Sequence, residues 1–187
     1  MANFNPYMER IDMDFWRDLC REEGVLRRYT KGDFFLREGE FARHFGFIES
    51  GCFKYTVVDS IGEERITGFA PCHNLAGDFY SAVRHAPALN NLIATTHSAV
   101  WVISSEKVRL WLDTHPDIKS SFAEEIFRMA HERYLNLYRK SPKERYLELL
   151  QRCPDILQQV TLRELASYLQ ITPTHLSRIR KELLHGK

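Results

Sequence analysis

The stretch TLRELASYLQITPTHLSRIRKEL, residues 161–183, contains two helix starts about eleven residues apart. Thr161 opens a Thr-x-x-Glu capping box, and Thr172 is followed at once by Pro173. Both patterns are typical of helix N-termini. Ala166 is small enough to let a second helix cross the first closely. Two short helices joined by a tight turn form a helix-turn-helix, and we predict this motif here.

The second helix of such a motif enters the DNA major groove, with its first residues at the base edges. The side chains outside the inner face or at the helix starts can all donate hydrogen bonds. They are Thr161, Thr172, Thr174, His175, Ser177, Arg178 and Lys181. Arg178 suits a guanine, because its guanidinium can donate to O6 and N7 together. The hydroxyls of Thr161 and Thr172 suit phosphate oxygens. We therefore predict double-stranded DNA as a partner.

The charge of the chain is unevenly distributed. Residues 139–187 contain ten Lys/Arg and five Asp/Glu, a net charge of +5, whereas residues 1–138 have a net charge of −4. A basic end on an acidic body favours a polyanionic partner at that end. A solvated surface would have a similar composition, so two alternatives stay open. The C-terminal helices bind DNA, or they contact a protein partner of a small-ligand sensor module.

A long helix is predicted over residues 117–139, before this basic segment. Side chains at spacings of 4, 3, 4 and 4 form one stripe along it: Phe122, Ile126, Met129, Arg133 and Leu137. The stripe must pack either on the chain's own body or on the same stripe of a second copy. Arg133 favours a second copy, because an unpaired charge in a core is costly. We predict a dimerisation helix at 117–140 and a homodimer with these five residues at its interface.

Residues 29–112 have a different pattern. Short runs such as FKYTVV and RITGFA are separated by turn residues at regular intervals, and the DSIGEE segment between these two runs predicts a β-hairpin around Gly62. Many short strands at this spacing indicate a β-sandwich or β-roll. Short helices are expected at 12–23 and 105–115. The sequence thus predicts an α+β fold with a β-roll sensor domain at 1–116 and a helix-turn-helix domain at 141–187.

Composition and motifs exclude several classes of protein. The 187 residues are 44% hydrophobic and 27% charged, as in ordinary globular proteins. The first residues show no signal-peptide pattern, and the longest apolar runs are too short to cross a bilayer, so we expect a cytoplasmic protein with no membrane partner. The four cysteines form no CxxC pair. No catalytic motif stands out, and we predict that the protein is not an enzyme.

Several motifs together resemble the cAMP receptor protein/Fnr (Crp/Fnr) family of bacterial transcription regulators. They are KGDFFLREGE at 31–40, FIESGCFKY at 47–55, AGDFYS at 76–81, and the helix-turn-helix stretch. The resemblance implies an N-terminal double-stranded β-helix (jelly roll) of the cyclic-nucleotide-binding type. It also implies a homodimer that binds inverted-repeat DNA, a small-molecule effector, and RNA polymerase as a partner if the protein is an activator.

The sequence departs from the cAMP-binding members of that family. In those members a Gly-Glu pair is followed, after a short loop, by an Arg-Ser pair that grips the cyclic phosphate. Here Gly77-Asp78 stands in the first place and Pro87–Asn90 in the second. Without a bidentate cation the phosphate loses its strongest hydrogen bonds. The candidate pocket residues are Gly77, Asp78, Phe79, Arg84, Leu89 and Asn90. We expect an effector other than cAMP, of unknown identity.

Other departures concern cofactors and DNA contacts. An Fnr-type iron–sulfur cluster needs several N-terminal cysteines, and only Cys20 lies in that region. We therefore predict no metal site and no cofactor. The recognition helix begins with Pro173-Thr174, where the family often has Arg-Glu, which puts recognition of the usual half-site in doubt. We also expect a shortened DNA-binding domain, without the β-hairpin wing that often follows this helix.

Overall fold

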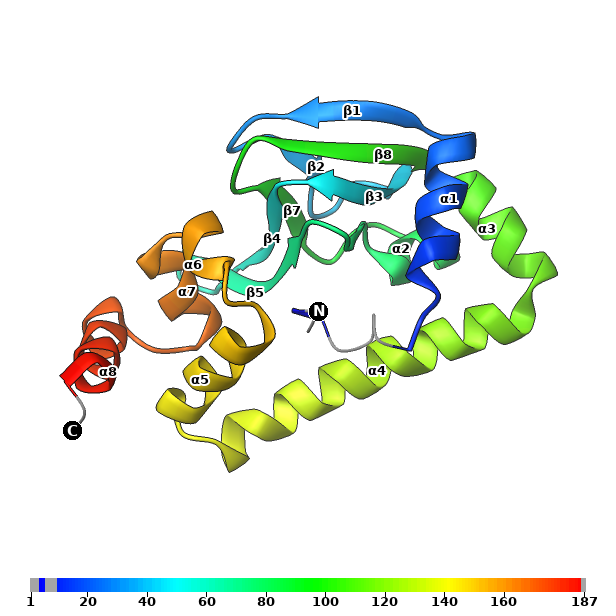
Figure 1. Cartoon of the computed structure of the whole chain (residues 1–187). Coiled ribbons are helices and arrows are strands. Elements are labelled where there is room, and N and C mark those ends of the chain that lie inside the picture. Colours follow the sequence, from blue (N-terminus) through cyan, green and yellow to red (C-terminus); the bar gives the residue numbers. More distant parts are fainter. Residues whose placement is uncertain (1–3, 6–9, 186–187) are drawn as a thin grey trace.

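The computed structural model describes residues 4–5 and 10–185 (Figure 1). Its N-terminal part is a sandwich of two antiparallel four-stranded sheets. The first sheet has the order β1 (Val25–Tyr29), β8 (Ser98–Ser104), β3 (His44–Ser50), β6 (Leu75–Ala76), and the second β2 (Phe34–Leu36), β7 (Asn91–Ala94), β4 (Cys52–Val58), β5 (Glu64–Pro71). The predicted α+β fold with a β-roll domain is confirmed.

The core of the β domain lies between the two sheets. Ile48 and Val100 come from the first sheet and Phe53 and Leu92 from the second, and all four are fully buried. Their neighbours along each strand point to the opposite face, because side chains alternate in a β-strand. The interior of the sandwich is therefore filled by apolar side chains from both layers.

The predicted hairpin connects β4 and β5. Val58 pairs with Glu64, and Gly62 has a φ of 85°, a conformation that costs glycine little. The Asp59 carboxylate accepts hydrogen bonds from the backbone N–H groups of Ile61 and Glu63, both at 3.0 Å. The turn sequence thus holds the two strands in register, and β5 becomes the strand on which the C-terminal helices rest.

Eight helices surround or follow the sandwich in the described part of the chain. They are α1 (Met13–Glu23), α2 (Phe79–Arg84), α3 (Ser105–Thr114), α4 (Pro116–Arg139), α5 (Pro142–Arg152), α6 (Ile156–Gln159), α7 (Leu162–Tyr168) and α8 (Pro173–His185). The sequence did not predict α2 or α6, which have only six and four residues and carry no full amphipathic period. None of the described helices is long and apolar enough to cross a membrane.

The C-terminal helices contact the β domain through α7 and β5. The Ser167 hydroxyl accepts a hydrogen bond from the backbone N–H of Ile66 at 3.0 Å. Phe4, from the start of the chain, is buried with its ring 5.6 Å from that of Phe69 and 5.5 Å from that of Tyr168. The N-terminal segment therefore joins β5 to α7, and the helix-turn-helix is held in a defined place beside the β domain.

Candidate nucleic-acid interface

The helix-turn-helix is formed by α7 and α8. Thr161 caps α7: its hydroxyl accepts from the Glu164 N–H at 3.2 Å, and the Glu164 carboxylate accepts from the Thr161 N–H at 2.8 Å. The Thr172 hydroxyl accepts from the His175 N–H at 3.2 Å and starts α8. Between the helices Gln170 takes a φ of 55°, the left-handed conformation that often ends a helix. Both predicted helix starts are present.

The inner face of α8 packs on α7. Leu176 and Ile179 are buried against Leu165, Ala166 and Leu169, in one hydrophobic cluster. Ala166 is fully buried, as expected for a small residue where two helices cross. Because the apolar face of α8 is buried inside the domain, the polar side chains of this helix must face outward.

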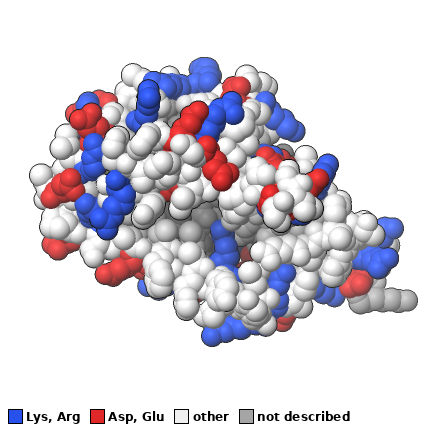
Figure 2. Space-filling view, turned by 180° about the vertical axis from the view of Figure 1, so that it is seen from behind, with Lys and Arg blue, Asp and Glu red and all other residues white. Residues whose placement is uncertain are grey.

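The outer face of α8 gathers most of the predicted DNA contacts. Thr174, Ser177, Arg178 and Lys181 line a shallow surface depression together with Pro173, and His175 is exposed beside it. No side chain of these four polar residues makes an ion pair or hydrogen bond with the described part of the chain. Figure 2 shows Lys and Arg atoms grouped at this end of the molecule, next to the grey C-terminal residues. The surface is cationic and free to bind.

The two capping threonines are already engaged. The Thr161 hydroxyl donates to the Glu164 carboxylate at 2.9 Å, in addition to accepting from its backbone. The Thr172 hydroxyl accepts from His175. A phosphate at the start of α7 would therefore be met first by backbone N–H groups, and by the Thr161 hydroxyl only after its cap rearranges. At the start of α8 the Thr172 hydroxyl only accepts in its cap, so it can still donate to a phosphate.

The predicted stripe of α4 faces its own chain. Phe122 is only 2% exposed, with its ring 5.6 Å from that of Trp16 and 4.5 Å from that of Phe79. Ile126 and Met129 pack against the same cluster. The prediction is therefore wrong for Phe122, because this side chain is enclosed by its own β domain and its own helices.

Arg133 is also directed toward its own chain. Its guanidinium donates to the Thr67 carbonyl oxygen at 2.9 Å and lies over the rings of Phe4 and Tyr168. The cost of an unpaired charge is thus reduced by a carbonyl and two aromatic faces, without a second copy. The position of Arg133 in the stripe is therefore explained by contacts within its own chain and does not require a dimer.

A different face of α4 is apolar and uncovered. Phe127, Tyr134 and Tyr138 are 70%, 55% and 76% exposed. At 3.6 residues per turn they lie roughly 120° around the helix from the predicted stripe. Their spacing of 7 and 4 residues is a helical pattern that can be recognised in the sequence. Sequence reasoning missed it because the other stripe was longer and more continuous.

The six predicted effector-pocket residues lie in α2 and in the loops on either side of it. Asp78 caps α2, and its carboxylate accepts from the N–H groups of Ser81 at 3.2 Å and Leu89 at 3.4 Å. It thus connects the two halves of the loop directly. Phe79 points to Phe122, and the side chains of Arg84 and Leu89 are exposed.

Gly77 and Asn90 occupy constrained positions in the same loop. Gly77 has a φ of 149°, and an added Cβ would lie 2.8 Å from the Phe45 ring. The Tyr55 hydroxyl donates to the Gly77 carbonyl oxygen at 3.0 Å. Asn90 Oδ1 is buried without a hydrogen-bond partner among the described residues. The glycine is required by the packing of the loop on Phe45.

Comparison with known proteins identifies the β domain. Residues 26–115 match the family model of the cyclic nucleotide-binding domain. This part of the chain, which includes most of the β domain, is therefore similar to that domain family. A search of curated proteins found no match to the chain.

Solved structures extend the likeness from the β domain to the C-terminal helices. FixK2 from Bradyrhizobium japonicum is 18% identical, with a TM-score of 0.75 over 87% of this chain and 85% of that one. The c-di-GMP-responsive global regulator CLP of Xanthomonas campestris is 16% identical, with a TM-score of 0.65 over 88% of each chain. The Thermus thermophilus catabolite activator protein is 18% identical, with a TM-score of 0.55 over 90% and 82%. The predicted resemblance to the Crp/Fnr family is confirmed at the level of the fold.

The interior of the β domain is filled by aromatic and aliphatic side chains. Tyr29, Phe35 and Phe53 form an aromatic cluster there, with ring centroids 5.5–6.1 Å apart. The surrounding cluster consists of apolar side chains of both sheets. Arg84, one of the six candidate pocket residues, is exposed at the end of α2.

Proposed function

We propose that this protein is a DNA-binding transcription regulator that acts as a homodimer on inverted-repeat operators. The outer face of α8 carries the proposal: Thr174, Arg178 and Lys181 are exposed, cationic or hydrogen-bonding, and unpaired within the described chain. The buried inner face of the same helix fixes which side chains point outward. A recognition helix needs both properties.

The homodimer would form through the exposed face of α4. Phe127, Tyr134 and Tyr138 leave a line of rings in water on a long helix, the pattern that a two-helix seam covers. With a two-fold axis parallel to α4, each copy of the chain contributes one α8 helix. The dimer then has one recognition helix for each half-site of an inverted repeat. The dimer interface of this proposal is the uncovered face, in place of the stripe that begins at Phe122.

The effector of the β domain would not be cAMP. The Asp78 carboxylate holds the N–H groups of Ser81 and Leu89 that could otherwise meet an anion, and its own charge repels a phosphate. The exposed Arg84 makes no hydrogen bond or ion pair with the described residues. We propose that the domain serves as a scaffold or takes a ligand of another class, with no metal or cofactor. A catalytic role has no support here, and RNA polymerase stays a predicted partner only for an activator.

Selection of duplexes from a random DNA pool, without added ligand and at two salt concentrations, tests the function. We expect an enriched inverted repeat whose binding weakens steeply with salt, because each neutralised phosphate releases counterions. Absence of any enriched sequence at low salt, with the dimer intact, would contradict a regulator that is active without effector.

One observation favours the second candidate, a sensor module whose C-terminal helices contact a protein. Leu184 is 81% exposed near the end of α8, and Leu183 is partly exposed beside it. Apolar side chains at this place suit a protein surface better than DNA. Salt distinguishes the two functions, because an apolar protein interface does not show the steep loss of affinity that phosphate contacts cause.

A further inference from the structure

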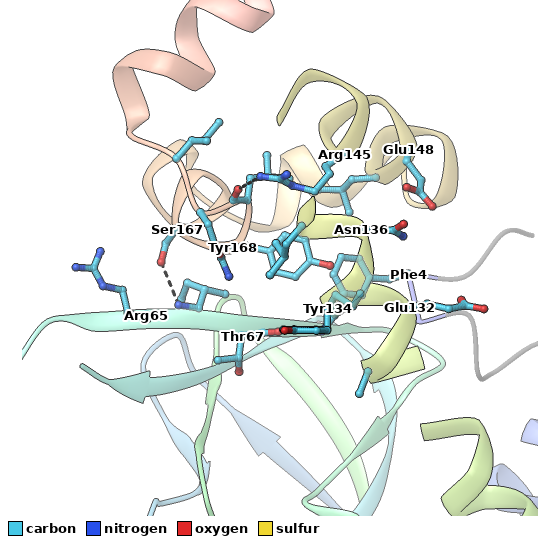
Figure 3. A pocket seen from close by; sticks show the side chains of 18 of the residues that line it. Phe4, Arg65, Thr67, Glu132, Tyr134, Asn136, Arg145, Glu148, Ser167 and Tyr168 are labelled. Atoms are coloured by element: carbon cyan, nitrogen blue, oxygen red, sulfur yellow. Dashed lines mark hydrogen bonds between the residues drawn. The ribbon is translucent and has the colours of Figure 1, made fainter. Parts of the chain in front are cut away.

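A large cavity lies where the β domain, the long helix and the helix-turn-helix domain meet. Its volume is about 960 Å³, and its walls come from β5, α4, α5 and α7 (Figure 3). This is the size range of small-molecule sites, which often lie at domain junctions. Nothing in the sequence pattern had indicated a site here, because its walls are contributed by segments as far apart in the sequence as Phe4 and Pro173.

The walls combine aromatic rings with charge. Phe4, Tyr134 and Tyr168 line the cavity, as do four arginines and two glutamates. Both glutamates are already paired: Glu132 with Arg128 at 2.7 Å, and Glu148 with Lys140 at 2.6 Å. They leave little negative charge for other groups in the cavity.

Two of the four arginines also have carboxylate partners. Arg65 pairs with Asp59 at 2.6 Å, and Arg152 lies 3.5 Å from Glu148. Arg133 and Arg145 have none among the described residues. Arg133 meets only the Thr67 carbonyl and two rings, and Arg145 donates to the carbonyl oxygens of Lys140 at 2.7 Å and Leu169 at 2.9 Å.

These two guanidinium groups approach the same end of α7. Arg133 lies 5.1 Å from the ring centre of Tyr168, and Arg145 bonds the carbonyl of the next residue, Leu169. Arg145 Nε is buried and has no hydrogen-bond partner in the described chain. A buried donor without an acceptor and two cations without counter-charge are both unfavourable unless something anionic completes them.

We propose that this cavity binds a small organic anion, with a carboxylate or phosphate group held by Arg133 and Arg145 and an aromatic body against Phe4, Tyr134 and Tyr168. The charge of these two guanidinium groups, which no carboxylate among the described residues neutralises, selects the anionic group, and the three rings select a flat apolar body. The site is distinct from the interior of the β domain, where the cyclic nucleotide-binding fold would hold its ligand.

Occupation of this cavity would act on the position of the DNA-binding helices. The walls include Ser167, which bonds Ile66 of β5, and Thr172 and Pro173, which start α8. Tyr134 belongs both to the cavity and to the exposed face of α4. A ligand here touches the sensor domain, the α4 face and the recognition helix at once. This regulatory consequence rests on the proposed function, whereas the binding itself does not.

Isothermal titration calorimetry of the full chain, without DNA, tests the site. The probes are indole-3-acetate as an aromatic carboxylate, AMP as an aromatic phosphate, and inorganic phosphate alone. We expect saturable binding of at least one of the two aromatic anions, and binding of inorganic phosphate that is at least tenfold weaker. Absence of saturable heat with both aromatic anions overturns the proposal, as does equal affinity for inorganic phosphate.

Three variants locate the binding. Arg133→Met removes one cation and should lower the affinity for the aromatic anion at least tenfold. Asn136→Trp places a large ring in the cavity wall and should abolish binding, while the unliganded variant keeps a cooperative thermal transition. Arg139→Met is the matched control on the same helix outside the cavity, and should leave affinity unchanged. If Arg133→Met and Asn136→Trp both bind the probe like the unaltered protein, the ligand sits elsewhere and the proposal is wrong.

Discussion

Lys54 Nζ lies 3.1 Å from Glu164 Oε1, which joins a central strand of the β domain to the first helix of the helix-turn-helix. The two side chains are only 14% and 16% exposed, so this ion pair is largely withdrawn from water. Glu164 also completes the capping box of α7, and Lys54 also pairs with Glu64 at 2.7 Å. One carboxylate therefore helps to fix both the start of α7 and its place against β4.

Glu164→Gln should destabilise the protein by about 1.5–3 kcal/mol, the range for a hydrogen bond to a charged group. Glutamine can still close the capping box, so the change chiefly removes the attraction to Lys54. Chemical denaturation of the full chain measures the effect. Glu144→Gln is the matched control, because Glu144 closes the same kind of box with Ser141 and forms no ion pair in the described chain. It should cost about 0.5 kcal/mol or less. Equal losses of stability in the two variants would show that the effect comes from the capping box and not from the ion pair with Lys54.

The contribution of Glu164 should depend on pH. Burial raises the pKa of this carboxyl, but hydrogen bonds from Thr161 and Lys54 outweigh it and hold the pKa below its ordinary value of 4.5. The stabilisation is thus fully present above about pH 4.5 and is lost as pH falls through the lower, folded-state pKa. We expect the stability difference between the unaltered protein and Glu164→Gln to be constant from pH 7 to 5 and to shrink below pH 4.5. If this stability difference instead grows as the pH falls, the pKa of Glu164 in the folded protein is raised and the prediction is wrong.

Arg178→Ala should cost about 1–3 kcal/mol in discrimination between the selected operator and random duplex, if Arg178 bonds a guanine bidentately. Arg180→Ala is the control, because Arg180 is exposed on the same helix but outside the depression lined by Thr174, Arg178 and Lys181. Affinities for both duplexes are measured at one fixed salt concentration. Equal losses on specific and random DNA would make Arg178 a phosphate contact.

Phe127→Glu should dissociate the homodimer, because it places two like charges face to face along the proposed seam. Sedimentation equilibrium gives the mass directly. Ile118→Glu is the control, since Ile118 is an exposed apolar residue of α4 on a different side of the helix. Met129→Glu should instead destabilise the monomer, because Met129 packs on the core around Trp16 and Phe122. If the dimer survives in Phe127→Glu but is lost in a Met129→Glu variant that still folds, the dimer interface is the stripe predicted from the sequence.

Local sequence signals predicted most of the secondary structure around the candidate site. The Thr161 capping box, the Thr172 helix start and the Gly62 hairpin all depend on residues within four positions of one another. The partners in such short-range hydrogen bonds are neighbours in the sequence, so a local pattern is enough to predict them. The inner face of α8 followed from periodicity alone, because Leu176 and Ile179 recur at helical spacing.

The dimer stripe shows where periodicity stops being sufficient. The spacing of Phe122, Ile126 and Met129 correctly indicated a buried face of α4, but periodicity does not identify the surface that buries it. The chain's own α1 and α2 supply that surface, through Trp16 and Phe79. Arg133 was misleading for the same reason: its partners, Thr67 and Tyr168, lie far away in sequence.

The sequence by itself determined the order of the longer elements, the class of fold and the outward residues of the recognition helix, because these follow from propensities, caps and side-chain periods within a few residues. The tertiary structure alone decided which face of α4 stays uncovered, how Asp78 closes the loop of the β domain, and the cavity around Arg133 and Arg145. These features are formed by side chains tens of residues apart, and their burial and charge balance exist only once the domains are in contact.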